Sequence, residues 1–89
     1  MATQQQIEDA VLNCLRHVPF ENLTLDAPFD DFWQRVEEQD DRTNRGIHRV
    51  DLFIKCLRDA LESGVLINRD MLLQGKISTP RDIVDIILD

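Results

Sequence analysis

The chain has 89 residues, enough for one domain with a single modest core. Apolar residues make up 43% of it and charged residues 30%, which is typical of a folded domain rather than a disordered one. The formal net charge of −7 argues against generic nucleic-acid binding, which requires Lys and Arg to neutralise phosphates, and against anionic membrane surfaces. We therefore expect protein partners, no nucleic acid and no membrane.

The first segment predicts an amphipathic helix that ends at Pro19. Thr3 followed by Gln6 is a capping-box pattern, and apolar residues then recur at steps of three and four. These apolar residues are Ile7, Ala10, Val11, Cys14, Leu15 and Val18. His17 is expected at the carboxyl end, where a cation is favourable to the helix dipole. The first six residues lack the basic and apolar regions of a signal peptide, so we expect a cytoplasmic protein.

The next stretch predicts a connector held against the core, a short helix and an exposed acidic loop. Asp26 and Pro28 are helix-start signals. The apolar face of the short helix would comprise Phe29, Phe32, Trp33 and Val36. Residues 39–46 contain no apolar side chain, so we expect a loop that is mobile over residues 38–45. Residues 26–41 hold seven acids against one base, Arg35, which indicates a solvated surface more than a docking site for a basic protein.

The strongest predicted helix follows that loop and is expected to be central in the bundle. Its apolar face comprises Val50, Phe53, Ile54, Leu57, Ala60 and Leu61, widened by Leu52 and Cys56. Gly64 is a suitable residue to end it. Because both cysteines fall on apolar helix faces and neither belongs to a CxxC pair, we expect free core thiols rather than redox or metal-binding groups.

Two further helices complete the predicted fold. Asn68 would cap a short helix over residues 69–74 that Gly75 ends, and Thr79, Pro80 and Asp82 suit the first positions of the last helix. Its inward residues would be Ile83, Val84, Ile86 and Ile87. No segment alternates with a period of two residues. The sequence therefore predicts a single all-α domain, residues 1–89, with three main helices and one or two short ones.

No catalytic or metal-binding constellation stands out. His17 and His48 lack a metal-ligand spacing with Cys or acidic residues, and no nucleophile–base pair or phosphate loop is present. The acids Asp26, Asp30 and Asp31 resemble a loose metal cluster, but helix capping is the preferred interpretation. We therefore expect no metal site and no enzymatic activity.

Three stretches, in this order and spacing, are similar to one known family. Residues 23–32 (LTLDAPFDDF) resemble the loop that precedes its modification site, and residues 67–70 (INRD) its turn into a short helix. Residues 76–87 (KISTPRDIVDII) resemble its closing helix. The family is that of the acyl carrier proteins. The resemblance covers nearly the whole chain and implies a small acyl-carrier-like helical bundle.

The modification site itself differs from the family's motif. Acyl carrier proteins have Gly-x-Asp-Ser-Leu-Asp at the start of the central helix, and the Ser carries 4′-phosphopantetheine. Residues 46–51 (GIHRVD) keep the first Gly and Asp51, place Val50 at the Leu and His48 at the Asp, and place Arg49 at the Ser. A guanidinium offers only hydrogen-bond donors and cannot become a phosphate ester. The resemblance thus implies a carrier-like module without a cofactor at the usual position.

The surroundings of Arg49 depart from the family as well. Thirteen residues, 33–45, intervene where the family has almost none. With Arg42, Arg45 and His48, Arg49 forms a basic patch suited to an anion, although neutralisation of the acidic run 37–41 is the preferred interpretation. The central helix also presents both bases and acids, unlike the acidic docking helix of the family.

The leading prediction is a monomeric, non-catalytic binding or accessory module. Its partners would be proteins, such as enzymes of fatty-acid, polyketide or peptide synthesis. One alternative is an atypical carrier that is modified elsewhere, although Thr43, Ser63 and Ser78 are each interpreted as capping or surface hydroxyls. Another alternative is an unrelated helical domain for protein–protein interaction.

Overall fold

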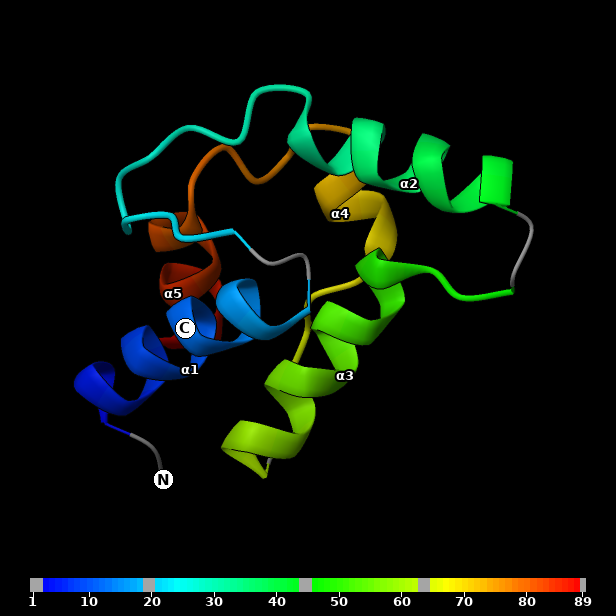
Figure 1. The fold of residues 1–89 in the computed structure, drawn as a ribbon. Coiled ribbons are helices and arrows are strands. Elements are labelled where there is room, and N and C mark those ends of the chain that lie inside the picture. Colours follow the sequence, from blue (N-terminus) through cyan, green and yellow to red (C-terminus); the bar gives the residue numbers. More distant parts are fainter. Residues whose placement is uncertain (1–2, 19–20, 44–45, 63–64, 89) are drawn as a thin grey trace.

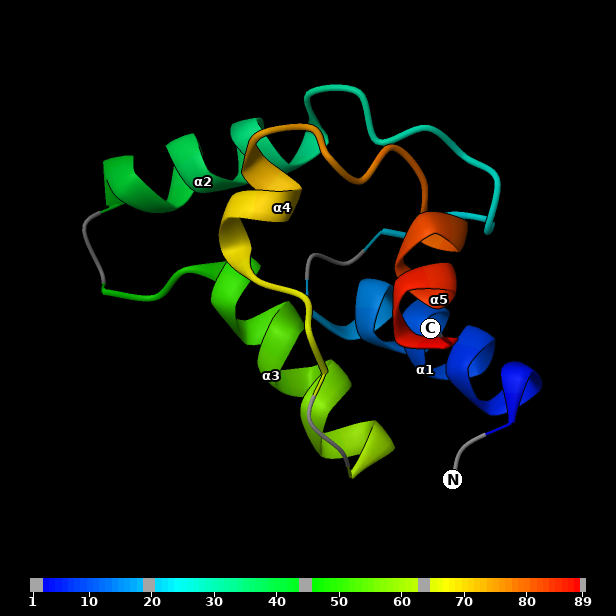
Figure 2. The same ribbon diagram turned by 180° about the vertical axis from the view of Figure 1, so that it is seen from behind.

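The computed structural model describes residues 3–18, 21–43, 46–62 and 65–88. Within these residues the chain is all-α, as predicted, and has no strand. Its helices are α1 (Gln4–His17), α2 (Phe32–Thr43), α3 (Arg49–Leu61), α4 (Arg69–Leu73) and α5 (Pro80–Leu88). Helix α1 packs against both α3 and α5, while α2 lies across the other end of the bundle, against α3 and α4 (Figures 1 and 2).

The helix caps predicted at Thr3, Asn68 and Thr79 are present. At α1, the Thr3 hydroxyl accepts from the Gln6 N–H at 3.2 Å and the Gln6 side chain accepts from the Thr3 N–H at 2.9 Å. At α5, Thr79 and Asp82 make the same reciprocal pair, at 3.3 and 3.2 Å. The Asn68 side chain caps α4. Each cap satisfies backbone donors that have no partner inside the helix.

One hydrophobic core joins the helices, and an aromatic group connects α2 to it. Trp33 is 1% exposed, and its ring centroid lies 4.9 Å from that of Phe53 on α3 and 5.5 Å from that of Phe29. Ile54 and Leu57, predicted as core residues, are both buried. Because aromatic side chains bury large apolar areas, this group fixes α2 against the start of α3.

The connector between α1 and α2 lies along the segment before α5, in both views of the chain (Figures 1 and 2). The Phe29 N–H donates to the Ser78 carbonyl at 2.8 Å, and the Arg81 N–H donates to the Leu25 carbonyl at 2.9 Å. The connector is therefore held against the core, as the sequence predicts for its apolar residues.

The prediction of an exposed loop over residues 39–46 is wrong for residues 39–43, which belong to α2. The helix begins at Phe32 rather than beside Pro28, and it places Trp33, Val36 and Asp40 on one buried face. Residues 44 and 45, the end of the segment expected to be mobile, lie outside the described residues. Three of the four acids of this helix, Glu37, Asp40 and Asp41, lie close to basic side chains from other parts of the chain, which reduces their mutual repulsion.

Helix α3 is less enclosed than predicted. Leu52 is 42% exposed and Ala60 is also exposed, although both were expected in the core. The reason is that α3 packs against α1, α2 and α4 and leaves its remaining side open. Glu62, in the left-handed conformation with φ of 52°, provides the carboxyl-terminal cap. Gly64, predicted for that position, lies outside the described residues.

The two cysteines are joined, which contradicts the prediction of free thiols. Cys14 on α1 and Cys56 on α3 form a disulfide, with their Cα atoms 5.9 Å apart. Spacing along the sequence did not indicate it because the two residues are 42 positions apart. Disulfides are typical of oxidising compartments, so the cysteines do not support the expected cytoplasmic location. No helix in the described ranges is long and apolar enough to cross a bilayer.

Candidate functional site

The candidate site is the amino-terminal end of α3, where the acyl carrier resemblance places the modified Ser. Arg49 is the first residue of this helix, and its backbone N–H donates to Asp40 Oδ2 at 2.7 Å. Its guanidinium Nε donates to Asp40 Oδ1 at 3.0 Å, and Nη2 donates to the Gln39 side chain at 3.0 Å. Asp40 is only 9% exposed. Helix α2 therefore places an internal carboxylate at the start of α3.

This carboxylate explains why a base can stand at a helix start. Free N–H groups and the helix dipole make that end favourable for an anion and unfavourable for a cation. His48, the residue before the helix, makes no side-chain cap bond. Asp40 supplies the cap from another helix and at the same time neutralises the guanidinium of Arg49.

A second group of charges lies beside the first, around Glu37 of α2. His48 Nδ1 lies 2.5 Å from Glu37 Oε1 and 3.7 Å from Asp41 Oδ1, while Arg69 of α4 pairs with Glu37 Oε2. Arg69 also lies 3.6 Å from Asp51, the acid that matches the carrier motif. The start of α3 is thus tied to both α2 and α4 by ion pairs.

Two members of the predicted basic patch, His48 and Arg49, contact acidic side chains of α2. Arg49 pairs with Asp40 of α2, so the interpretation that these bases neutralise the acidic run is confirmed for Arg49, and His48 contacts Glu37 of the same helix. Arg42 is exposed near the end of α2, and Arg45 lies outside the described residues. Val50, which stands at the Leu position of the carrier motif, is buried in the core.

Asp26 and Asp31, for which the sequence favours helix capping over a metal cluster, instead pair with two different arginines. Arg81 of α5 donates to both carboxylate oxygens of Asp26, at 2.7 and 3.2 Å. These hydrogen bonds hold the pKa of Asp26 below its ordinary value. Asp31 pairs with Arg35 one helical turn later. Asp26 and Asp31 nevertheless stay 76% and 71% exposed, so these two pairs lie at a solvated surface, as the sequence predicts.

Sequence reasoning missed one constellation with metal-ligand chemistry. Oxygen or nitrogen atoms of Glu37, Asp41 and His48 lie within 4.8 Å of one another. Carboxylates and imidazole suit several divalent metals. However, the guanidinium of Arg69 already contacts Glu37, and a metal ion bound there would be repelled by this fixed positive charge. The group fits an ion-pair network better than a metal centre.

Two of the three hydroxyls considered as alternative modification sites lie in described segments. The Thr43 hydroxyl donates to the Asp40 carbonyl at 3.0 Å, at the end of α2. Ser78 precedes α5, where its N–H donates to Asp82 and its carbonyl accepts from Phe29. Neither lies at the start of α3. Ser63 lies outside the described residues.

Comparisons with protein-family models, with curated proteins and with solved structures find no match. The resemblance to acyl carrier proteins therefore depends on the sequence stretches quoted above and stays a prediction.

Proposed function

We propose that this chain is an acyl-carrier-like binding module that does not accept 4′-phosphopantetheine. The observation that carries the proposal is the contact between Asp40 and Arg49. Transfer of the prosthetic group requires a hydroxyl at the helix start that can attack phosphorus. The side chain at this position is instead a guanidinium, 27% exposed and bonded to a nearly buried carboxylate.

The amino-terminal end of α3, which could bind an anion, is already occupied by the Asp40 carboxylate. In a charged carrier, a phosphodiester would lie near this helix start, where N–H groups and the dipole favour negative charge. Here the Asp40 carboxylate accepts a hydrogen bond from the backbone N–H of Arg49 at this helix start. A phosphate brought to the same end would meet this negative charge and would have to displace it.

Helix α2 supports the same proposal. Most of residues 33–45, the segment that the family lacks, form this helix, and it packs against both α3 and α4. A partner would therefore meet α2 together with α3, rather than a prosthetic arm. We infer a role in protein contact, beside enzymes of fatty-acid, polyketide or related synthesis, with no catalysis by the chain itself.

The decisive experiment is the intact mass of the wild-type chain after incubation with coenzyme A and a broad-specificity phosphopantetheinyl transferase. An ordinary acyl carrier protein in the same reaction is the positive control. We expect the control to gain one phosphopantetheine group and this chain to gain none. A mass increase mapped to any Ser or Thr would overturn the proposal and favour an atypical carrier.

A pair of variants separates the missing hydroxyl from the carboxylate beside it. In Arg49→Ser, the Asp40 carboxylate loses its counter-ion and stays against the new hydroxyl. We therefore expect the double variant Arg49→Ser/Asp40→Asn to be modified to a greater extent than Arg49→Ser alone. Equal modification of the two would show that the charge of Asp40 is not an obstacle.

A further inference from the structure

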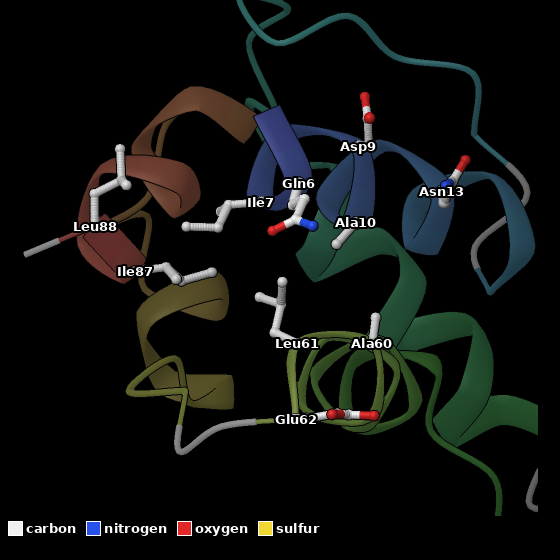
Figure 3. A pocket seen from close by; sticks show the side chains of 10 residues that line it. All are labelled: Gln6, Ile7, Asp9, Ala10, Asn13, Ala60, Leu61, Glu62, Ile87 and Leu88. Carbon is white, nitrogen blue, oxygen red and sulfur yellow. The ribbon is translucent and has the colours of Figure 1, made fainter. Parts of the chain in front are cut away.

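A groove lies between α3 and α5, at the opposite end of α3 from Arg49. Both helices pack against α1, yet no Cα atom of α3 comes within 8 Å of one in α5. The space between them has a volume of about 890 Å³. Figure 3 shows side chains of all three helices around it. The apolar ones are Ile7, Ala10, Ala60, Leu61, Ile87 and Leu88.

The apolar lining is partly open to solvent. Leu88 is 46% exposed, and Leu61 and Ile87 are half-buried although the sequence predicts both as inward-facing. Adjacent exposed apolar side chains in a concave site are typical of binding surfaces, whereas isolated ones are common everywhere. These side chains stay partly exposed because α3 and α5 do not pack against each other.

The charges around the groove have one sign. Its charged lining residues are Asp9 of α1 and Glu62 at the end of α3, and the other polar ones are the neutral Gln6 and Asn13. No Lys, Arg or His is among the described residues that line it. Figure 3 shows Asp9 and Glu62 on opposite sides of the apolar centre.

We propose that this groove binds an amphipathic helix of a partner protein, with apolar residues on one face and Lys or Arg beside them. The space between two helices, with a third as its floor, matches the way an amphipathic helix inserts into a hydrophobic groove. Basic residues flanking the apolar face would meet Asp9 and Glu62.

Other occupants fit the charges less well. A fatty acid or a phospholipid would bring a carboxylate or phosphate toward an acidic rim. A second copy of this chain would bring a net charge of −7 to a rim of the same sign. A basic helix is the occupant for which both the shape and the charge are favourable.

The proposal names a partner chemistry for the binding role proposed above and rests on that role, but its test does not involve Arg49. The groove begins at Ala60, about 16 Å along the α3 axis from that residue at 1.5 Å per residue. Phosphopantetheine transfer and helix binding are therefore measured on separate surfaces, and either proposal can fail while the other holds.

The test uses two synthetic helical peptides of about 16 residues with the same Leu face, one flanked by Lys and the other by Glu. Each is titrated into the isotopically labelled full chain, and binding is measured from amide shifts. The groove variant is Asp9→Lys/Glu62→Lys. The matched control, Glu38→Lys/Asp70→Lys, makes the same change in net charge at exposed positions of α2 and α4.

We expect the Lys peptide to bind the wild type, with shifts concentrated at the groove, and the Glu peptide to bind at least about tenfold more weakly. The groove variant should lose about tenfold in affinity for the Lys peptide, and the control variant should keep it. Absence of Lys-peptide binding, equal binding of both peptides, or equal losses in both variants would overturn the proposal. Shifts confined to another surface would overturn it too.

Discussion

Asp40 both caps α3 and neutralises Arg49, and its own helix buries it. Three hydrogen bonds depend on this one carboxylate, from the backbone N–H and from the Nε of the same arginine. Burying a carboxylate is energetically unfavourable unless the carboxylate is paired, so Asp40 and Arg49 depend on each other for stability. Removing either partner leaves the other without its counter-charge.

We predict that Asp40→Ala lowers the free energy of unfolding by about 1–3 kcal/mol, because α3 loses a cap and Arg49 loses its ion pair. Urea denaturation followed by the fluorescence of Trp33, the only tryptophan, measures this. The control is Asp41→Ala, whose side chain is 65% exposed, and its expected effect is within about 0.5 kcal/mol. Equal losses in the two variants would contradict the assigned role of Asp40.

At the level of helices, the sequence predicts the features that depend on residues close together in the chain. The caps at Thr3 and Thr79 are formed with residues three positions away, so a local pattern reveals them. The extent of α2 depends instead on distant partners. The Gln34 side chain donates to the Leu73 carbonyl at 2.5 Å, and Glu37 pairs with Arg69. Such contacts exist only after the chain has folded.

At the candidate site, too, the sequence predicts the local features and not the long-range contacts. The sequence places Arg49 where a carrier would have Ser, and it suggests that nearby bases neutralise the acidic run. It does not identify Asp40 as the partner, because residues 39–46 have no apolar side chain and were predicted as a loop. The periodicity that would have revealed the helix consists of Trp33, Val36 and Asp40, and its last member is an acid.

The orientation of α3 can be tested by truncating side chains on its two sides. Leu57 is fully buried, so Leu57→Ala should reduce the free energy of unfolding by about 2–5 kcal/mol through lost burial and a remaining cavity. Leu52 is predicted as a core residue but is 42% exposed, so Leu52→Ala should reduce the free energy of unfolding by less than about 1 kcal/mol. Chemical denaturation of both variants provides the comparison, and a reversed order would show that α3 is rotated.

For the whole molecule, α1 is the helix that connects the two sides of the bundle. It contacts α3 and α5, which do not contact each other, and thereby forms the floor of the groove. The ion pairs at the start of α3 belong to the other end, formed by α2 and α4. The disulfide between Cys14 and Cys56 joins α1 to α3 between these two ends.

We predict that the disulfide contributes to the stability of the whole chain. Closing a loop between residues 42 positions apart restricts the unfolded chain, and a chain-entropy estimate for that length is about 4 kcal/mol. Reduction should therefore lower the free energy of unfolding by about 2–4 kcal/mol. Denaturation with and without reductant measures the difference, and mass after thiol alkylation establishes the redox state in each sample.

The double variant Cys14→Ala/Cys56→Ala is the control for this measurement. It should resemble the reduced wild type and should not respond to reductant, because neither sulfur remains. The disulfide also joins the floor of the groove, α1, to one of its walls, α3, so we expect the double variant to bind the Lys peptide more weakly. Alkylation of both cysteines in the oxidised, folded chain would contradict the disulfide. A reductant effect that persists in the double variant would show that the change in stability has another origin.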